Sequence, residues 1–236
     1  MNAKVSGAVD IALESATARD VIANLVRAMA QFEMPAPSAR NVASTKLARA
    51  SMDYGIALCV LGESAPGDLG APLISLHRMQ MEHVIRSAFF GGPATDEELE
   101  RFVVDDEMPT VLTANGKKRR MTIAELTERV EPFFDAEGDG KITRVVRSNY
   151  GLISGVVHGG RALLALYGAP GEPIGFSVDK RSVVQIIDHA VSFAHLATIV
   201  IAKSAVDSPE RFSELMLPHF EAIKGYVAKQ HARIYE

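Results

Sequence analysis

Apolar residues recur mainly three or four positions apart along the chain, and no strict apolar–polar alternation extends beyond a few residues. Spacing of three and four places apolar side chains on one face of an α-helix, whereas alternation would indicate a half-buried strand. The pattern therefore predicts an all-α protein. Helices are expected at eight ranges: 5–33, 39–63, 68–90, 95–104, 121–134, 141–158, 180–205 and 208–232.

Residues that form turns separate most of these ranges. Proline and glycine cluster at 34–37, 62–67 and 91–93, and such clusters mark the ends of helices. Residues 160–179 show the weakest helical pattern. Within them, 161–167 fits either a continued helix or a short strand, and the remainder is expected to be a loop.

No connecting segment is long or polar enough to require a second domain. A chain of 236 residues can bury a substantial core as one unit. We therefore expect a single-domain bundle of about seven to eight helices spanning residues 1–236. In this bundle, N-terminal helices at 5–63 pack on a core at about 68–205, and a C-terminal helix at 208–232 follows.

The composition is that of a soluble globular protein, with 47% hydrophobic and 23% charged residues. A net charge of −4 gives no general attraction to nucleic acid or to an anionic membrane. Cys59 is the single cysteine, so no internal disulfide forms, which fits a reducing compartment. Residues 183–202 match a membrane span in length, but their polar side chains favour a core helix. We expect a cytoplasmic protein that has no membrane partner.

Charged residues form a stripe on the helix predicted at 68–90. Arg78, Glu82 and Arg86 follow at i, i+4 and i+8 and therefore share one face. Apolar residues nearly encircle this stripe, so we expect it to be partly buried, where charges must be paired. Two interpretations remain open: a structural ladder of salt bridges, or a ladder with one arginine left over to bind an anion such as phosphate.

A second polar face lies on the helix predicted at 141–158. Ser154 and His158 stand one turn apart, and Gly159-Gly160 follows, which can supply the left-handed residue that closes a helix. His158 is then either a capping or core histidine, or one wall of a site. The capping interpretation predicts no contact of His158 with Arg78 or Glu82.

A third polar face is expected on the helix predicted at 180–205. Its members recur at three- and four-residue spacing and are Gln185, Asp188, Ser192 and His195. We expect the three polar faces to converge in a buried network, which either fixes the packing or lines a site.

Metal binding has one weak candidate. Asp135, Glu137 and Asp139 fit the first, third and fifth loop positions of a calcium-binding EF-hand. Val146, however, stands where a bidentate glutamate is needed, so calcium binding at 135–146 is a minor alternative. No histidine or cysteine spacing supports zinc or di-iron, and no cofactor is expected.

A compact basic run, Lys117-Lys118-Arg119-Arg120, follows Asn115-Gly116. The run fits a solvated charge cluster or a contact to phosphates. No aromatic residue interleaves with it, so base stacking is unsupported.

The motifs Arg78-x-x-x-Glu82 and Ser154-x-x-x-His158-Gly-Gly give the chain a resemblance to uncharacterised bacterial all-helical families. In these families an arginine–glutamate helix precedes a helix that ends in a Ser/Thr-x-x-x-His-Gly motif, and the resemblance covers about 73–202. The families are themselves similar to HEPN domains, several of which are metal-independent ribonucleases. The HEPN ribonuclease pattern places an arginine four to six residues before the histidine, whereas Arg147 lies eleven before His158.

The resemblance implies a bundle with a HEPN-like core and a site formed by Arg78, Glu82, Arg86, Ser154 and His158. His158 would be the general acid–base group, an arginine would stabilise phosphorane-like charge, and Glu82 would orient an arginine. Our first hypothesis is therefore a homodimeric domain that binds or cleaves RNA or a nucleotide-type anion in stress or defence. The alternative is a non-catalytic helical interaction protein whose polar network is structural.

Overall fold

The chain is a helical bundle with a small β-hairpin at one end. The computed structural model describes residues 10–34, 37–65, 70–134, 139–167, 179–206 and 208–235. Its elements in chain order are α1 (Ile11–Met29), α2 (Ala39–Ser64), α3 (Gly70–Gly91), α4 (Asp96–Asp105), β1 (Thr110–Leu112), β2 (Lys118–Arg120), α5 (Ile123–Phe134), α6 (Lys141–Val157), α7 (Arg161–Leu166), α8 (Lys180–Ala205) and α9 (Pro209–Tyr235). The all-α prediction is confirmed.

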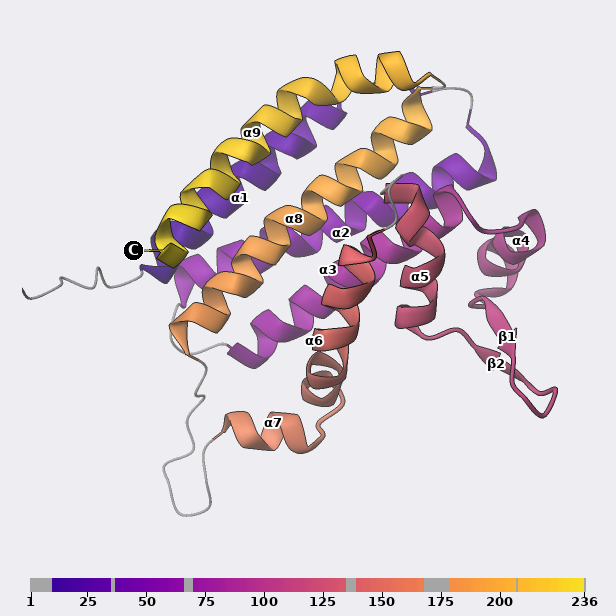
Figure 1. Cartoon of the computed structure of the whole chain (residues 1–236), viewed down its shortest axis with the longest axis horizontal. Coiled ribbons are helices and arrows are strands. Elements are labelled where there is room, and N and C mark those ends of the chain that lie inside the picture. The colour runs from indigo at the N-terminus through magenta and orange to yellow at the C-terminus, as the bar shows by residue number, and fades with distance from the viewer. Residues whose placement is uncertain are drawn as a thin grey trace, which may run out of the picture.

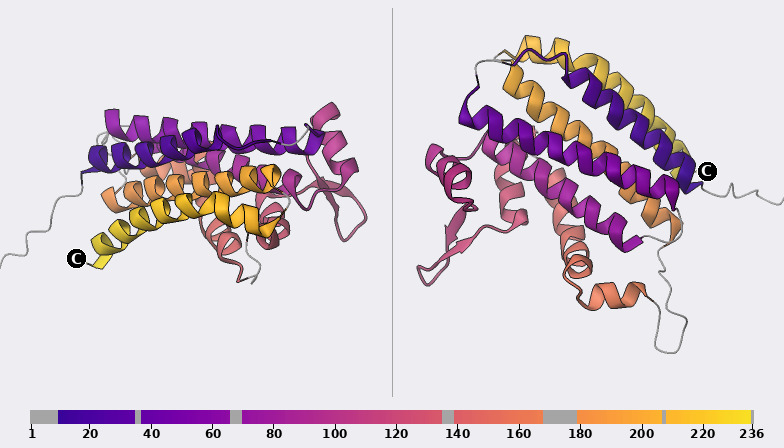
Figure 2. Two further views of the ribbon diagram at one scale, coloured as in Figure 1. Left: turned by 90° about the horizontal axis from the view of Figure 1, so that it is seen from above. Right: turned by 180° about the vertical axis from the view of Figure 1, so that it is seen from behind.

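Four long helices, α1, α2, α3 and α8, form the core of the bundle. They lie side by side, with α9 along the outside of α1 and α8 (Figure 1). The two further views show the same layered arrangement (Figure 2). Fully buried apolar side chains fill the space between these helices, including Ile22, Met52, Leu58, Phe89 and Ile187. Burial of such side chains contributes about 1.5–3 kcal/mol each, which makes this layer the main source of stability.

Short polar side chains join α2 closely to α3. The hydroxyl of Ser44 donates to the carbonyl of Ser87 at 3.1 Å, and the hydroxyl of Ser87 donates to the carbonyl of Ser44 at 2.8 Å. Both serines are fully buried, so this exchange satisfies both hydroxyls. Gly55 allows equally close approach, because a Cβ there would meet the Gln80 amide nitrogen at 2.5 Å.

The peripheral elements are arranged around α3. Helices α5 and α6 pack on α3 and on each other, and α7 packs on α6. Helix α4 and the hairpin stand beyond the end of α3, where Leu99 of α4 still reaches the core (Figure 1). This arrangement leaves the polar stripe of α3 facing α6.

Helix α8 is the one described helix that is long and apolar enough to cross a membrane, a test that core helices also pass. Within its most apolar window, 50% of the residues are buried inside the bundle. Buried residues such as Ile187 and Ala194 contribute to the core that α8 forms with α1, α2 and α3. The packing of α8 is therefore that of a central bundle helix.

The predicted helix ranges agree with the structure to within a few residues, apart from the first helix. That helix begins at Ile11, because the carboxylate of Asp10 accepts from the backbone N–H groups of Ala12 and Leu13 at 3.0 and 3.2 Å. It ends at Met29 rather than near residue 33. Between the two interpretations of residues 161–167, the structure shows a short helix at Arg161–Leu166.

The hairpin of β1 and β2 was not predicted. Its strands have three residues each and pair antiparallel, with Thr110 opposite Arg120 and Leu112 opposite Lys118. Three residues are too few to display the alternation that identifies a strand. The hairpin therefore lies in a segment for which the sequence pattern predicted a connection without regular structure.

Candidate functional site

The charged stripe on α3 is a ladder of two ion pairs that share one carboxylate. Arg78 Nε donates to Glu82 Oε1 at 2.6 Å, and Arg86 Nη2 donates to Glu82 Oε2 at 2.8 Å. The side chains of Arg78 and Glu82 are only 11% and 9% exposed, whereas that of Arg86 is 28% exposed. The predicted partial burial of the stripe is confirmed. Two guanidinium groups against one carboxylate leave the ladder with a net positive charge.

Helix α6 brings His158 and Tyr150 to the same place. Arg78 Nη1 lies 2.9 Å from His158 Nε2, and Arg78 Nη2 donates to the Tyr150 hydroxyl at 3.1 Å. The Tyr150 hydroxyl in turn donates to Glu82 Oε1 at 3.2 Å. We call Arg78, Glu82, Arg86, Tyr150 and His158 the α3–α6 cluster. Residues about 70 to 80 positions apart in the sequence thus meet in one hydrogen-bonded group.

The hydrogen-bond pattern assigns protons within the cluster. An arginine side chain has only donors, so His158 Nε2 must accept from Arg78, and the histidine proton resides on Nδ1. Burial, followed by the negative charge of Glu82, raises the pKa of Tyr150. The Tyr150 hydroxyl therefore keeps the proton that it donates to Glu82. Burial opposes the charge on Arg78, but the hydrogen bond and charge of Glu82 outweigh it and raise the pKa of Arg78.

His158 occupies the C-cap of α6, and its backbone N–H donates to the Ser154 carbonyl at 3.0 Å. Gly159 follows with φ of 70°, the left-handed conformation predicted for this position. The backbone of His158 thus ends the helix while its ring reaches Arg78. Capping and contact with the arginine occur together, so the expectation that capping precludes this contact is wrong.

Ser154 and Arg86 differ from the rest of the predicted site. Ser154 is half-buried on α6, and its hydroxyl makes no hydrogen bond to any described residue. Arg86 contacts Glu82 through Nη2 only, and its Nε is buried without an acceptor within the described protein. Arg86 is therefore the cluster member with hydrogen-bonding capacity to spare.

The polar face of α8 does not join this cluster, so convergence of all three faces is incorrect. Asp188 accepts from the hydroxyl of Tyr226 on α9 at 3.0 Å. The ring of His195 lies edge-on to that of Phe220 on α9, with centroids 5.2 Å apart. The α8 face packs against α9, on the other side of the bundle from α6. Periodicity identified the face but not the helix that it meets.

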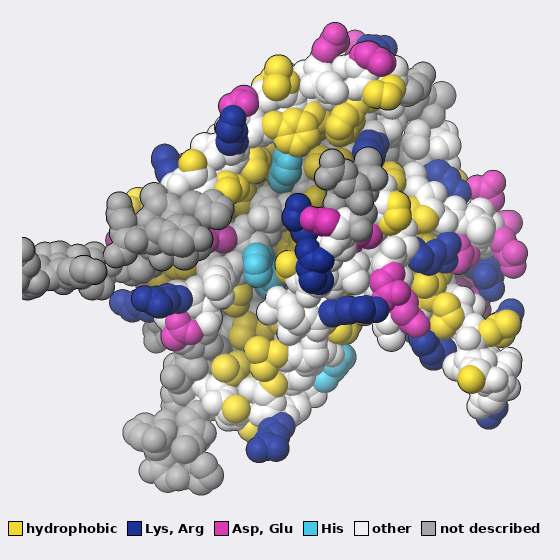
Figure 3. All heavy atoms as spheres, in the orientation of Figure 1, with side chains coloured by type: hydrophobic (Ala, Val, Ile, Leu, Met, Phe, Trp, Pro, Cys, Tyr) yellow, Lys and Arg dark blue, Asp and Glu magenta, His cyan; other side chains and the backbone are white. Residues whose placement is uncertain are grey.

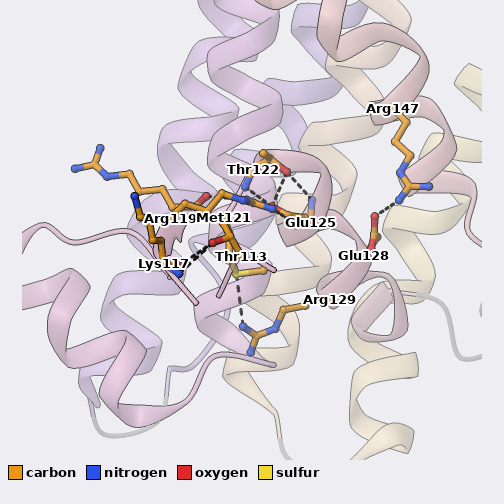
Figure 4. A network of polar contacts seen from close by, with 10 residues as sticks. Thr113, Lys117, Arg119, Met121, Thr122, Glu125, Glu128, Arg129 and Arg147 are labelled. Atoms are coloured by element: carbon orange, nitrogen blue, oxygen red, sulfur yellow. Dashed lines mark hydrogen bonds and ion pairs between the residues drawn. The ribbon is translucent and has the colours of Figure 1, made fainter. Parts of the chain in front are cut away.

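Helix α5 carries a row of glutamates that sequence reasoning missed. Glu125, Glu128 and Glu131 stand at i, i+3 and i+6, and each holds a different neighbour. Glu125 pairs with Arg119 of the hairpin, and Glu128 pairs with Arg147 of α6 (Figure 4). Arg147, the arginine nearest before His158 on α6, is thus engaged by α5 rather than by the α3–α6 cluster.

Glu131 completes the row by capping α6 from outside. Its carboxylate accepts from the backbone N–H groups of Ile142 and Thr143 at 3.0 and 2.8 Å. The N-cap of α6 is Gly140, which has no side chain to satisfy these donors. The i, i+3 spacing of the glutamates was the available signal, but their partners come from two other elements, the hairpin and α6.

The calcium alternative falls largely outside the described residues, because Asp135 and Glu137 lie there. The described member, Asp139, accepts from the backbone N–H of Lys141 at 3.0 Å and pairs with its ammonium group at 2.7 Å. Within the described ranges, no three histidine, cysteine, aspartate or glutamate side chains gather closely enough to hold a metal ion.

No protein-family model matches the chain, and comparisons with curated proteins and with solved structures also gave no match. The resemblance to HEPN-like families accordingly rests on the two motifs, and any function must be argued from the geometry of the α3–α6 cluster.

Proposed function

We propose that the protein is a HEPN-like domain that binds, and can cleave, RNA or a nucleotide-type anion at the α3–α6 cluster. The observation that supports this proposal is the meeting of Arg78, Glu82 and His158 beside a second arginine that is only partly engaged. A net positive, partly buried group beside an exposed histidine suits a phosphate-containing ligand.

Arg86 is the residue best placed to take the anion. All three nitrogens of the Arg78 guanidinium are engaged, by Glu82, His158 and Tyr150. Arg86 uses one nitrogen, and its buried Nε lacks an acceptor within the described protein. A buried donor without a partner costs about 1–3 kcal/mol, which a bound phosphate oxygen would recover.

His158 has the features of a general acid–base group. Its Nε2 faces Arg78, and its exposed position at the end of α6 leaves it open to a ligand. In cleavage, a ligand draws Arg78 away from Nε2, and His158 Nε2 then accepts the proton of the RNA 2′-hydroxyl as its oxygen bonds to phosphorus. The P–O5′ bond breaks, and the leaving 5′-oxygen takes that proton back from His158. Arg86 then stabilises the charge on the phosphorane-like centre, Glu82 orients both arginines, and Ser154 supplies a hydroxyl beside the ligand.

A non-catalytic interaction protein is the second candidate function, and one observation favours it. Arg78 is 11% exposed and bonded to three partners inside the protein. Such a closed arrangement fits a cluster that fixes how α6 packs on α3 without binding any ligand.

Two variants, His158→Ala and Arg86→Gln, separate the two functions. Under the first function, each variant abolishes RNA cleavage or strongly weakens nucleotide binding, and thermal stability hardly changes. Under the second, His158→Ala lowers the free energy of unfolding by about 1–3 kcal/mol and alters no activity. Binding is measured by fluorescence anisotropy at low salt, and cleavage by gel analysis of end-labelled RNA.

Arg147→Gln is the matched control, because Arg147 lies on α6 but pairs with Glu128, away from the cluster. This control should bind and cleave as the natural sequence does. Wild-type protein that neither binds nor cleaves RNA or nucleotides at low salt would contradict the proposal. The proposal also includes a homodimer, which light scattering tests, and a cytoplasmic location, which cell fractionation tests.

A further inference from the structure

The β1–β2 hairpin projects from the bundle, and only its base packs on the core, through Met121 and the half-buried Val111. It extends away from the helices in all three views (Figures 1 and 2). Pro109 and Met121 are buried at its base, where the Met121 backbone N–H donates to the Pro109 carbonyl at 2.8 Å. Every residue between them is exposed or only half-buried. The hairpin is therefore available for contacts outside the protein.

One arginine holds the hairpin in place. Arg119 makes a bidentate ion pair with Glu125 of α5, with N–O distances of 2.7 and 2.5 Å (Figure 4). The turn is closed by Thr113, whose backbone N–H and hydroxyl both donate to the Lys117 carbonyl at 2.8 and 2.9 Å. Gly116 adopts φ of 75° within this turn. The tip is thus a defined structure with a fixed orientation relative to α5.

The remaining basic residues of the hairpin are unpaired. Side chains alternate between the faces of a strand, so Lys118 and Arg120 lie opposite the face that Arg119 presents to Glu125. Lys117 adds a third charge at the turn. None of the three forms a salt bridge with a described residue, and the sequence has no acidic residue between Glu107 and Glu125. A protein of net charge −4 therefore concentrates positive charge on a projecting ribbon; lysine and arginine side chains reach its tip in Figure 3.

We propose that Lys117, Lys118 and Arg120 form a binding site for the phosphate backbone of RNA. Exposed lysine and arginine side chains on a narrow ribbon can approach several phosphates of one strand, releasing counterions as they bind. The hairpin carries no aromatic residue, so it contacts the backbone and does not stack on bases. Leu112 is the one large exposed apolar side chain beside the basic residues, too little apolar surface for insertion into a membrane.

This inference deepens the proposed function and rests on it in taking RNA as the ligand. It names a polynucleotide, rather than a mononucleotide, as the natural ligand of the protein. The hairpin and the α3–α6 cluster are separate surfaces, since they share no residue. The Arg147–Glu128 ion pair between α6 and α5 belongs to neither surface. Substitutions in one surface can therefore be compared with substitutions in the other.

The test is the triple variant K117Q/K118Q/R120Q, titrated into fluorescein-labelled single-stranded RNA of about 20 nucleotides over a series of salt concentrations. Affinity at low salt should fall about tenfold or more. The slope of log affinity against log salt should shrink by about 2, since three phosphate contacts each contribute roughly 0.7 on a single strand. The melting temperature should not change, because all three side chains are exposed.

The matched control is K46Q/K180Q/K224Q, which removes three exposed lysines from other parts of the surface. If the control loses as much affinity and slope as the hairpin variant, the binding is nonspecific and the inference is overturned. Wild-type binding to phosphatidylserine vesicles but not to RNA would also overturn it.

The Arg86→Gln variant distinguishes failure of this inference from failure of the proposed function. If the hairpin variant loses RNA binding while Arg86→Gln and His158→Ala alter neither binding nor cleavage, the hairpin site stands and the cluster proposal fails. If the hairpin variant binds RNA as wild type does and Arg86→Gln abolishes nucleotide binding, the cluster proposal stands and the hairpin inference fails.

Discussion

The α3–α6 cluster and the hairpin both contain several basic residues, but their environments differ. The cluster holds its charges partly buried and paired, whereas the hairpin exposes them to solvent. In the cluster, Arg78 and Arg86 share Glu82, which is 9% exposed, and two further groups come from α6. In the hairpin, Lys118 and Arg120 flank Arg119 and are exposed. A buried charge requires its partner, whereas an exposed one is solvated by water. The cluster therefore pairs most of its charge inside the protein, with unused donors on Arg86, whereas the hairpin leaves its charge solvated.

The largest expected effect comes from removing the shared carboxylate of the cluster. Glu82→Ala leaves two arginines without their common partner, and we expect the free energy of unfolding to fall by about 3–5 kcal/mol. Urea denaturation followed by circular dichroism measures this change.

The hairpin provides the control for this prediction. Glu125→Ala removes the carboxylate that pairs with Arg119, at a side chain that is 29% exposed. A partly exposed ion pair contributes about 0–1 kcal/mol, and Glu125 also accepts from the backbone N–H of Thr122 at 2.8 Å, so this variant should lose about 1–2 kcal/mol, well below the Glu82→Ala loss. Equal losses in the two variants would show that burial does not distinguish the two regions.

Acid provides a second test, at the buried His77 of α3 and the half-buried His195 of α8. Burial lowers the pKa of His77 to about 3 and that of His195 to about 4, with help from neighbouring His189 and His219. The unfolded chain binds protons at these histidines below a pKa of about 6.5, whereas the folded protein resists doing so. Stability is therefore unaffected above pH 6.5 and falls as pH decreases from 6.5 toward the folded values.

By pH 5 the expected loss is about 2 kcal/mol for each histidine, measured as the urea midpoint across pH. His77→Phe should remove the contribution of His77 to this pH dependence. The free energy of unfolding at pH 7.5 should be nearly unchanged. His77 stacks on His189 with ring centroids 5.5 Å apart, between α3 and α8. A pH profile that is the same in wild type and His77→Phe would exclude this interface as the source.

The smallest effect is expected for Tyr150→Phe, which keeps the ring and removes one hydroxyl from the cluster. The variant loses one hydrogen bond from Arg78 and one to Glu82, so we expect a loss of about 1 kcal/mol in thermal or urea unfolding. Tyr54→Phe is the control, because the hydroxyl of Tyr54 makes no hydrogen bond to a described residue. Equal losses in the two variants would show that the Tyr150 hydroxyl contributes no more to stability than a hydroxyl without such hydrogen bonds.

Periodicity was sufficient to predict the helices and the residues that share a face. The spacing of Arg78, Glu82 and Arg86 predicted their common face, because helix geometry fixes it, and the apolar residues around them predicted their partial burial. The same reasoning placed Ser154 and His158 together on α6. It did not predict that only His158 reaches α3, since that depends on where the end of α6 lies relative to Arg78.

Long-range partners were the part that sequence patterns could not provide. The α8 face containing Asp188 and His195 was identified correctly, but it meets α9 rather than α6. Glu131 caps α6 from another helix because Gly140 has no side chain, a relation with no local signature. The homodimer, the cytoplasmic location and the HEPN-like ribonuclease role stay predictions.

The row of glutamates on α5 has a geometric consequence for any ligand. Glu125 fixes the hairpin, whereas Glu128 and Glu131 fix the middle and the beginning of α6, the helix that ends at His158. Helix α5 therefore holds the hairpin directly and His158 through α6. The length of α5 thus sets the shortest RNA strand that can contact the hairpin and His158 at the same time. Oligonucleotides of increasing length would therefore show a threshold in affinity, and that threshold would measure the separation of the two surfaces.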